Sequence, residues 1–383
     1  MLRLASFYIA YYAALGAFTP YWSLYLQSQG MGIAAISVLM SLWYATRIVA
    51  PSTWTLLAAR SPRPVRWLQF GCLLTLASFA LFLLPWKFAG LFAAMCAFCF
   101  FYNAVMPQFE SITQSHLRGR TDLYGLIRVW GSIGFIVVVA GYGLLIDVVG
   151  VHWLPWMMLP LFGGLLLAAF RNDYAQPPAH VAHASDAGFR ERLRRPEVIA
   201  FFVAAFLIQV SFGPYYTFFS IYLGEHGYSP SMQGVLWSIG VLVEIGLLFQ
   251  SQRIFRRWGA HRLLVFSLGI TVLRWWVTAA WPDSLTAMVL AQATHAFSFA
   301  AFFAAAMLLL ADYFPGRHNG HGQGVFYGLS SGVGGVIGAL LAGQLWRFSG
   351  QVAFAVSGFI ALAACAVAWY WLLRKPRLAL RNA

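Results

Sequence analysis

The stretch FYNAVMPQFESITQSHLRGRTDLYGLIRVWGSIGF, residues 101–135, decides how the chain folds. Two apolar runs flank a short basic turn, and each run carries one charge. Glu110 lies eight residues before Arg118 in the first run. Arg128 lies eight residues after Arg120 in the second. At ~1.5 Å per helical residue, both charges lie ~12 Å from the turn. They therefore sit at one depth on antiparallel helices, with opposite sign.

Charges at that depth in an apolar helix call for an explanation. Ionisable residues inside a membrane are costly, normally face the interior of a helix bundle, and mark substrate or proton pathways. Asn103 shares the helical face of Glu110, and Phe135 shares the face of Arg128. We therefore expect these four residues to line a transport site. The alternative is a buried ion pair that only fixes packing.

The composition is that of an integral membrane protein. Of 383 residues, 61% are hydrophobic and 9% are charged, whereas soluble domains carry about 25% charged residues. Apolar runs of the ~20 residues that cross a bilayer recur twelve times. The sequence thus predicts an all-α polytopic protein with two six-helix bundles, residues 1–171 and 197–383. Residues 172–196 form the predicted cytoplasmic linker, with a short surface helix over 187–195.

The formal charge of +14 reports topology and not nucleic-acid binding. Most of the arginines fall in alternate connections, as the positive-inside rule requires of cytoplasmic loops. Both termini are therefore expected in the cytoplasm, and the protein in a bacterial-type inner (plasma) membrane. The basic connections contain Arg60, Arg63 and Arg66; Arg118 and Arg120; residues 190–195; residues 253–262; Arg317; and residues 374–381.

The two halves repeat each other. A shift of 197 residues places Arg47 on Glu244, and duplicated six-span halves would give such an ungapped register. The pairs that match in residue type include Gly16 with Gly213, Ser23 with Ser220, Gly30 with Gly227, and Ser41 with Ser238.

Four more polar residues lie deep in predicted spans. Arg47 is ~20 Å and Glu244 ~13 Å from the nearest basic connection. Arg274 and His295 lie well inside later spans, with Gln292 and Phe299 on the same helical face as His295. A neutral histidine can also be a packing residue, so that role stays open for His295.

Two short motifs resemble cofactor or metal sites, but the sequence around each lacks the other residues or elements that such a site needs. Cys96-x-x-Cys99 has no second pair or nearby histidine, and it falls in a span. The glycines of residues 332–338 follow no strand, so they do not form a dinucleotide site. No nucleophile or metal cluster stands at an interface. We therefore expect no metal, no cofactor and no enzymatic activity, and a monomer in the lipid bilayer.

Several motifs together resemble those of a known family. They are Phe18-Thr19-Pro20-Tyr21-Trp22-Ser23, Ala45-Thr46-Arg47, Pro107-Gln108-Phe109-Glu110, Arg128-Val129-Trp130-Gly131-Ser132, Leu273-Arg274-Trp275 and Gln292-Ala293-Thr294-His295. The chain resembles the major facilitator superfamily over all its spans, and within it the phenylpropionate permease family of lactose-permease-like proton symporters. The resemblance implies two bundles that rock about a central cavity, driven by a proton gradient.

The resemblance also implies roles for single residues. Glu110 and Arg128 match the substrate-binding carboxylate and arginine of lactose permease, and Glu244, Arg274 and His295 match its proton-coupling and binding cluster. Two positions depart from that pattern, because Ser298 replaces a proton-carrying carboxylate and Phe135 replaces a stacking tryptophan. Glu110 and His295 are therefore further candidates for proton coupling beside Glu244.

The balance of charged residues deep within the predicted spans indicates the charge of the substrate. Three arginines (Arg47, Arg128 and Arg274) oppose two glutamates (Glu110 and Glu244), and a monocarboxylate would neutralise the excess. With the aromatic lining, this predicts proton-coupled uptake of a small aromatic acid such as 3-phenylpropionate. The first alternative is a sugar or nucleoside proton symporter that uses Asn103, Gln114 and Glu110. The second is a drug efflux antiporter.

Overall fold

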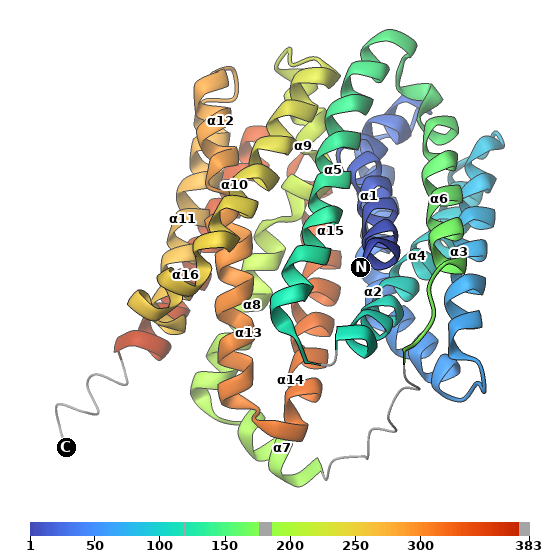
Figure 1. Cartoon of the computed structure of the whole chain (residues 1–383). Coiled ribbons are helices and arrows are strands. Elements are labelled where there is room, and N and C mark those ends of the chain that lie inside the picture. The colour runs from blue at the N-terminus through green and yellow to red at the C-terminus, as the bar shows by residue number, and fades with distance from the viewer. Residues whose placement is uncertain (118, 176–185, 375–383) are drawn as a thin grey trace, which may run out of the picture. The chain divides into compact units, whose positions relative to one another are not determined.

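The computed structural model describes residues 1–117, 119–175 and 186–374 (Figure 1). Within these residues all regular structure is helical, which confirms the predicted all-α class. Arg118, the linker residues 176–185 and the basic tail 375–383 lie outside the described residues.

The described helices have the lengths that a membrane requires. Eleven helical segments are long and apolar enough to cross a bilayer. Helix α1 (Leu2–Ser28) is also 27 residues long, but its tyrosines and tryptophan lower its hydropathy. Together they match the twelve predicted spans.

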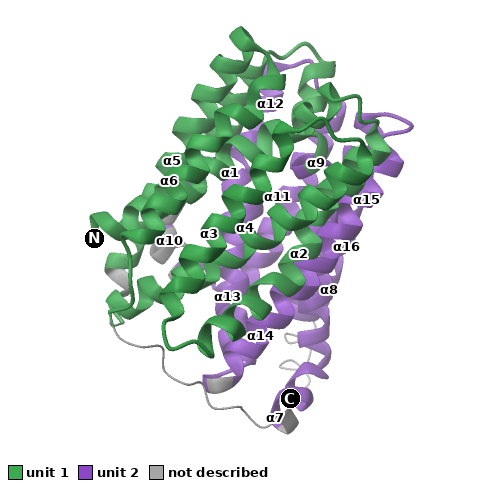
Figure 2. Cartoon of the chain, turned by 90° about the vertical axis from the view of Figure 1, so that its right-hand side faces the viewer, with its two compact units in different colours: residues 1–180, 217–238 green, residues 181–216, 239–383 purple. Residues whose placement is uncertain are grey.

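The helices fall into two compact units, coloured green and purple in Figure 2. Unit 1 comprises residues 1–180 and 217–238. Its helices are α1, α2 (Ile33–Ala59), α3 (Pro64–Ala80), η1 (Leu81–Leu83), α4 (Phe88–Leu117), α5 (Thr121–Val149), η2 (Val151–Trp153) and α6 (Leu154–Phe170), with parts of α9 (Gly213–Glu225) and α10 (Pro230–Trp258).

Unit 2 comprises residues 181–216 and 239–383. Its helices are α7 (Asp186–Leu193), α8 (Pro196–Ser211), α11 (Ala260–Ala280), α12 (Leu285–Ala293), η3 (Ala296–Ala301), α13 (Phe302–Tyr313), η4 (Gly316–His318), α14 (Asn319–Phe326), η5 (Tyr327–Gly334), α15 (Gly335–Leu345), α16 (Gly350–Ala368) and η6 (Trp369–Arg374), with the remainder of α9 and α10.

Residues 217–238, which the sequence assigns to the second bundle, pack with the first unit. The Tyr21 hydroxyl of α1 donates to Val139 O at 2.7 Å and to Pro230 O at 3.3 Å. Asp147, in the last turn of α5, accepts a hydrogen bond from Ser231 N at 3.3 Å. The bundle limits 1–171 and 197–383 stay a prediction, since α9 and α10 contribute to both units.

Within each unit the packing follows the sequence repeat. In unit 1, α1 packs against α5 and α6, and α4 packs against α2 and α3. In unit 2, α8 packs against η5, α15 and α16, and α11 packs against α13 and α16. The predicted linker helix is α7, whose Phe189 ring lies 5.0 Å from the Phe314 ring.

Two glycine pairs give the repeat a structural meaning. A Cβ on Gly16 would lie 2.6 Å from Phe135 O of α5, and one on Gly213 would lie 2.1 Å from Gly338 O of α15. Glycine at these matched positions lets the first helix of each half approach a later helix backbone to backbone. Gly30 and Gly227, also matched, follow α1 and α9 with φ of 77° and 80°, a conformation that favours glycine where a helix ends.

Candidate substrate-binding and coupling residues

The predicted site residues fall into two groups, one in each unit, and each group is described within its own unit. Unit 1 contains Arg47, Asn103, Glu110, Arg128 and Phe135. Unit 2 contains Glu244, Arg274 and His295.

Arg47 is held between α2 and α4 by Asn103. The Arg47 Nε donates to Asn103 Oδ1 at 3.3 Å, and the guanidinium lies 5.0 Å from the Trp43 ring. Asn103 is buried, and its Nδ2 donates to Trp43 O and to Thr46 Oγ1, each at 2.9 Å. Asn103 is therefore occupied by protein groups, and it orients the half-buried Arg47.

Glu110 is held by tyrosines. The Tyr124 hydroxyl of α5 donates to Glu110 Oε1 at 3.1 Å, and the Tyr8 hydroxyl of α1 also interacts with this carboxyl group. Among the side chains that the structure describes, no ion pair joins Glu110 to Arg128. The two charges nevertheless interact electrostatically, and the transport site and its packing alternative both stay predictions.

Arg128 lies against aromatic rings. Its guanidinium carbon is 3.9 Å from the centroid of the Tyr12 ring and 5.8 Å from that of the Tyr8 ring, both in α1. A cation over a tyrosine face is attracted by the ring quadrupole. Gly131 makes this approach possible, because a Cβ there would lie 2.7 Å from the Tyr12 ring.

Phe135 lies two turns farther along α5. Its side chain is buried, and its backbone carbonyl is the group that approaches Gly16 of α1. The position thus contributes to helix packing, and the predicted ligand contact of its ring stays a prediction.

Arg274 is the most deeply buried charge among the predicted site residues. Only 1% of the residue is exposed. Nη1 contacts His295 Nδ1 at 2.9 Å and donates to Ser298 Oγ at 3.1 Å, and Nη2 donates to Gln292 Oε1 at 3.2 Å. The guanidinium lies 4.3 Å from the Tyr215 ring. Its Nε is buried with no hydrogen-bond partner.

These contacts fix the state of His295. Arginine nitrogens only donate, so His295 Nδ1 must accept from Arg274. The ring proton of neutral His295 is then on Nε2, which lies 4.0 Å from Glu244 Oε2. Phe299 stacks on the imidazole at 5.3 Å between centroids. The chain Arg274–His295–Glu244 therefore joins a cation to a carboxylate through one imidazole.

The backbone at this cluster departs from an α-helix. The π-helical segment η3 begins directly after His295, and π-helical turns within helices are frequent at functional sites. Ser298, within η3, accepts from Arg274 and donates to His295 O at 3.2 Å. A serine stands where the resemblance implies a carboxylate, so the hydrogen-bond partners of Arg274 among the described residues (His295, Ser298 and Gln292) include no carboxylate.

Sequence reasoning missed Tyr215 and Tyr124. The Tyr215 hydroxyl donates to Gln292 Oε1 at 3.0 Å and so supports the group that binds Arg274. Phe212, Tyr215 and Tyr216 follow a helical i, i+3, i+4 spacing, and that stripe was the available signal. Tyr124 lies within the stretch 101–135, but nothing in the sequence assigned it a role.

Sequence comparisons place the chain among transporters. The model of the MFS_1 like family matches residues 1–356. A probable 3-phenylpropionic acid transporter of Escherichia coli is 27% identical over 365 residues, 94% of this chain and 95% of that protein. The maltose permease of Geobacillus stearothermophilus is 29% identical, covering 72% of this chain and 70% of the permease.

Solved structures show the same fold. A crystal structure of the nucleoside transporter NupG superposes with a TM-score of 0.81 at 14% identity, covering 97% of this chain and 98% of that one. The POT family transporter PepTSo superposes with a TM-score of 0.79 at 11% identity, covering 97% of each chain.

Proposed function

Because the chain belongs to the MFS_1 like family and is a membrane transporter of the major facilitator type, we propose that it imports a small aromatic carboxylate with protons. The model substrate is 3-phenylpropionate. The relative named a probable 3-phenylpropionic acid transporter matches nearly the whole length of this chain. That likeness motivates the substrate, and the chemistry of Arg274 supports it.

The observation that carries the proposal is the state of Arg274. A buried guanidinium whose hydrogen-bond partners His295, Ser298 and Gln292 include no carboxylate lacks a directly paired charge, and a buried charge is stable only when it is paired. Its Nε is without a partner, and Nη2 uses one of its two hydrogens on Gln292. Nε and Nη2 can form the planar donor pair that binds a carboxylate with two hydrogen bonds.

Aromatic side chains around each arginine suit the rest of the substrate. Arg274 has the Tyr215 and Trp275 rings at 4.3 and 4.7 Å, and Arg128 has the Tyr12 ring at 3.9 Å. Offset and edge-to-face ring contacts are worth about 0.5–1.5 kcal/mol beyond the area they bury. Such surroundings favour an aryl group over a sugar.

We assign proton coupling to Glu244, with His295 as its neighbour. Glu244 is partly exposed, its side chain retaining 24% of its accessible surface, whereas His295 is held by Arg274. A carboxyl group near a water-accessible cavity can gain and lose a proton as access alternates. The His295 Nε2 proton faces Glu244 and would stabilise its ionised form. Glu110 is the second carboxyl group that could carry the coupled proton.

The proposal is tested by uptake of labelled 3-phenylpropionate into proteoliposomes, with and without an inward proton gradient. Aromatic acids, maltose and uridine serve as competitors. We expect accumulation that depends on the gradient and is blocked only by aromatic acids. Inhibition by maltose or uridine, with proton movement, would instead establish a sugar or nucleoside symporter. Proton-driven extrusion of cationic dyes would establish the efflux alternative.

A further inference from the structure

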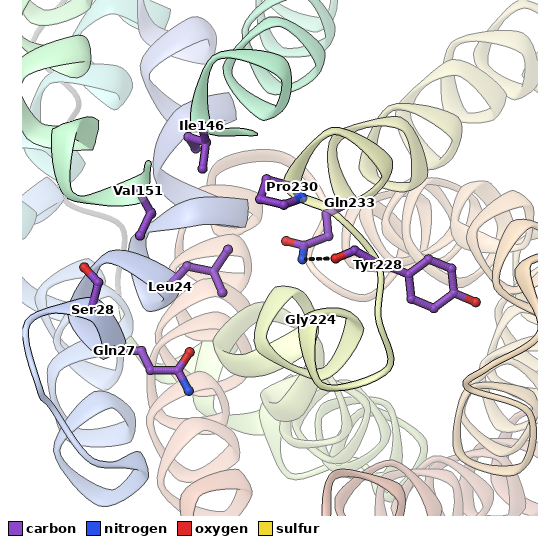
Figure 3. A pocket seen from close by; sticks show the side chains of 9 residues that line it. All are labelled: Leu24, Gln27, Ser28, Ile146, Val151, Gly224, Tyr228, Pro230 and Gln233. Carbon is purple, nitrogen blue, oxygen red and sulfur yellow. Dashed lines mark hydrogen bonds between the residues drawn. The ribbon is translucent and has the colours of Figure 1, made fainter. Parts of the chain in front are cut away.

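We propose a second binding site in unit 1, for a small organic cation that combines an ammonium group with an apolar body. The site is a cavity of about 490 Å³ at the end of the unit where α1 and α5 end. Its lining comes from α1, α5, η2, α9, α10 and, with Tyr228, the connection between α9 and α10 (Figure 3). The volume lies within the ~300–1,000 Å³ of small-molecule sites.

The first observation is the unpaired amide oxygen of Gln233. This residue is 1% exposed, and its Nε2 donates to Tyr228 O at 3.0 Å, which fixes the orientation of the amide. Its Oε1 is buried with no partner, and it points toward the side of the cavity where Leu24 lies (Figure 3). An unpaired buried acceptor leaves a place for one donor beside the cavity, either a water molecule or a ligand group.

The Ser28 hydroxyl of the lining also favours a donor. Ser28 Oγ donates to Tyr25 O at 2.7 Å, so toward the cavity it can only accept. Gln27, which is exposed at the rim, provides the only side-chain N–H group without an assigned partner. None of the nine lining residues, all of which the structure describes, is Lys, Arg or His.

Helix ends set the electrostatic sign of the cavity. Helices α1, α5 and α9 end here, at Ser28, Val149 and Glu225, and each carboxyl end carries a partial negative charge. The amino end of α10 opposes them with a partial positive charge. The Asp147 carboxylate accepts from Ser231 N and so offsets that end. A cation is therefore favoured over an anion.

The remaining lining is apolar and fixed in place. Leu24, Ile146, Val151 and the ring of Pro230 provide contacts for a hydrocarbon body (Figure 3). Next to the cavity, α10 packs closely on α5, because a Cβ on Gly234 would lie 2.6 Å from Val139 O. A site that is largely formed before binding loses less entropy when the ligand binds.

The experiment measures binding to the purified full-length protein with three probes that share a phenylethyl body. They are 2-phenylethylammonium, 2-phenylethanol and 3-phenylpropionate, titrated calorimetrically. We expect saturable binding of the ammonium probe, much weaker binding of the alcohol, and loss of ammonium binding in Gln233→Leu. Equal binding of the alcohol, or no saturable ammonium binding, would overturn the proposal.

Two variants of opposite charge at Gln27 test the site without altering the buried residues of unit 1. Gln27→Glu should tighten ammonium binding about fivefold and Gln27→Lys should weaken it by a similar factor, as expected for one charge at short range beside water. Gln351→Glu, an exposed charge on α16, is the matched control and should change nothing. If the two Gln27 variants bind the probe alike, the ligand is elsewhere. Binding is measured without transport, so the outcome is independent of the proposed uptake function.

Discussion

Arg274 uses the planar shape of its guanidinium as well as its charge, because three different neighbours accept its hydrogen bonds. Lysine keeps the charge but cannot reproduce this fork. We expect Arg274→Lys to weaken the apparent affinity for 3-phenylpropionate roughly 10- to 100-fold, as the loss of charged hydrogen bonds predicts. Concentration-dependent uptake measures this change. An unchanged KM would show that the carboxylate does not bind there.

Tyr12 offers a milder test in unit 1, where its ring faces Arg128 at 3.9 Å. Tyr12→Phe keeps the ring, whereas Tyr12→Leu removes it. We expect the leucine variant to raise KM about threefold to tenfold, the range of a partly desolvated cation–π contact, and the phenylalanine variant to resemble the native protein. Equal values for both variants would exclude a role of the ring face.

The sequence alone singled out the unusual residues of the candidate site but not their partners. Glu110, Arg128, Arg274 and His295 are conspicuous because charge and polarity are rare at that depth. Their neighbours come from helices whose mutual rotation the one-dimensional pattern does not specify. Tyr215 illustrates the limit, since a tyrosine in an aromatic-rich helix is not distinctive until its hydroxyl is seen to support Gln292.

Helix packing through glycine makes a sharp prediction for α9. A Cβ on Gly213 would lie 2.1 Å from Gly338 O, a backbone atom that cannot move independently. We expect Gly213→Ala to destabilise the protein by about 1–3 kcal/mol, the usual range for overpacking. Gly246→Ala in α10, which meets nothing within 4 Å, is the control. Thermal unfolding followed by size-exclusion chromatography compares them, and equal melting temperatures would contradict the packing argument.

Elements as a whole were predictable because a bilayer permits few structures. Every backbone group must be hydrogen-bonded within its own span, so long apolar runs must be helices. The interruptions were not predictable in the same way. The break between α8 and α9 at Phe212 precedes Gly213-Pro214 and had a local signal. The π-helical segments η3 and η5 had none, because their geometry depends on neighbouring helices.

Proton coupling is a property of the complete transport cycle. We expect that a substitution of Glu244 abolishes it. Glu244→Gln removes a titratable group while keeping the size and polarity of the side chain. Accumulation driven by a proton gradient should then disappear, whereas exchange of labelled for unlabelled 3-phenylpropionate should persist. Glu110→Gln is the comparison. Surviving accumulation in Glu244→Gln, with loss in Glu110→Gln, would move the proton carrier to unit 1.

The grouping of residues 217–238 with unit 1 has a consequence for a chain made in two pieces. A fragment of residues 186–383 still carries Pro230 and Ser231, which hydrogen-bond Tyr21 and Asp147 of the other piece, residues 1–175. Co-expressed, the two polypeptides should copurify through one affinity tag and restore uptake. Tyr21→Phe in the first piece removes the hydroxyl that donates to Pro230 O and should weaken this copurification. Covalent continuity through the linker would then be dispensable for assembly of this transporter.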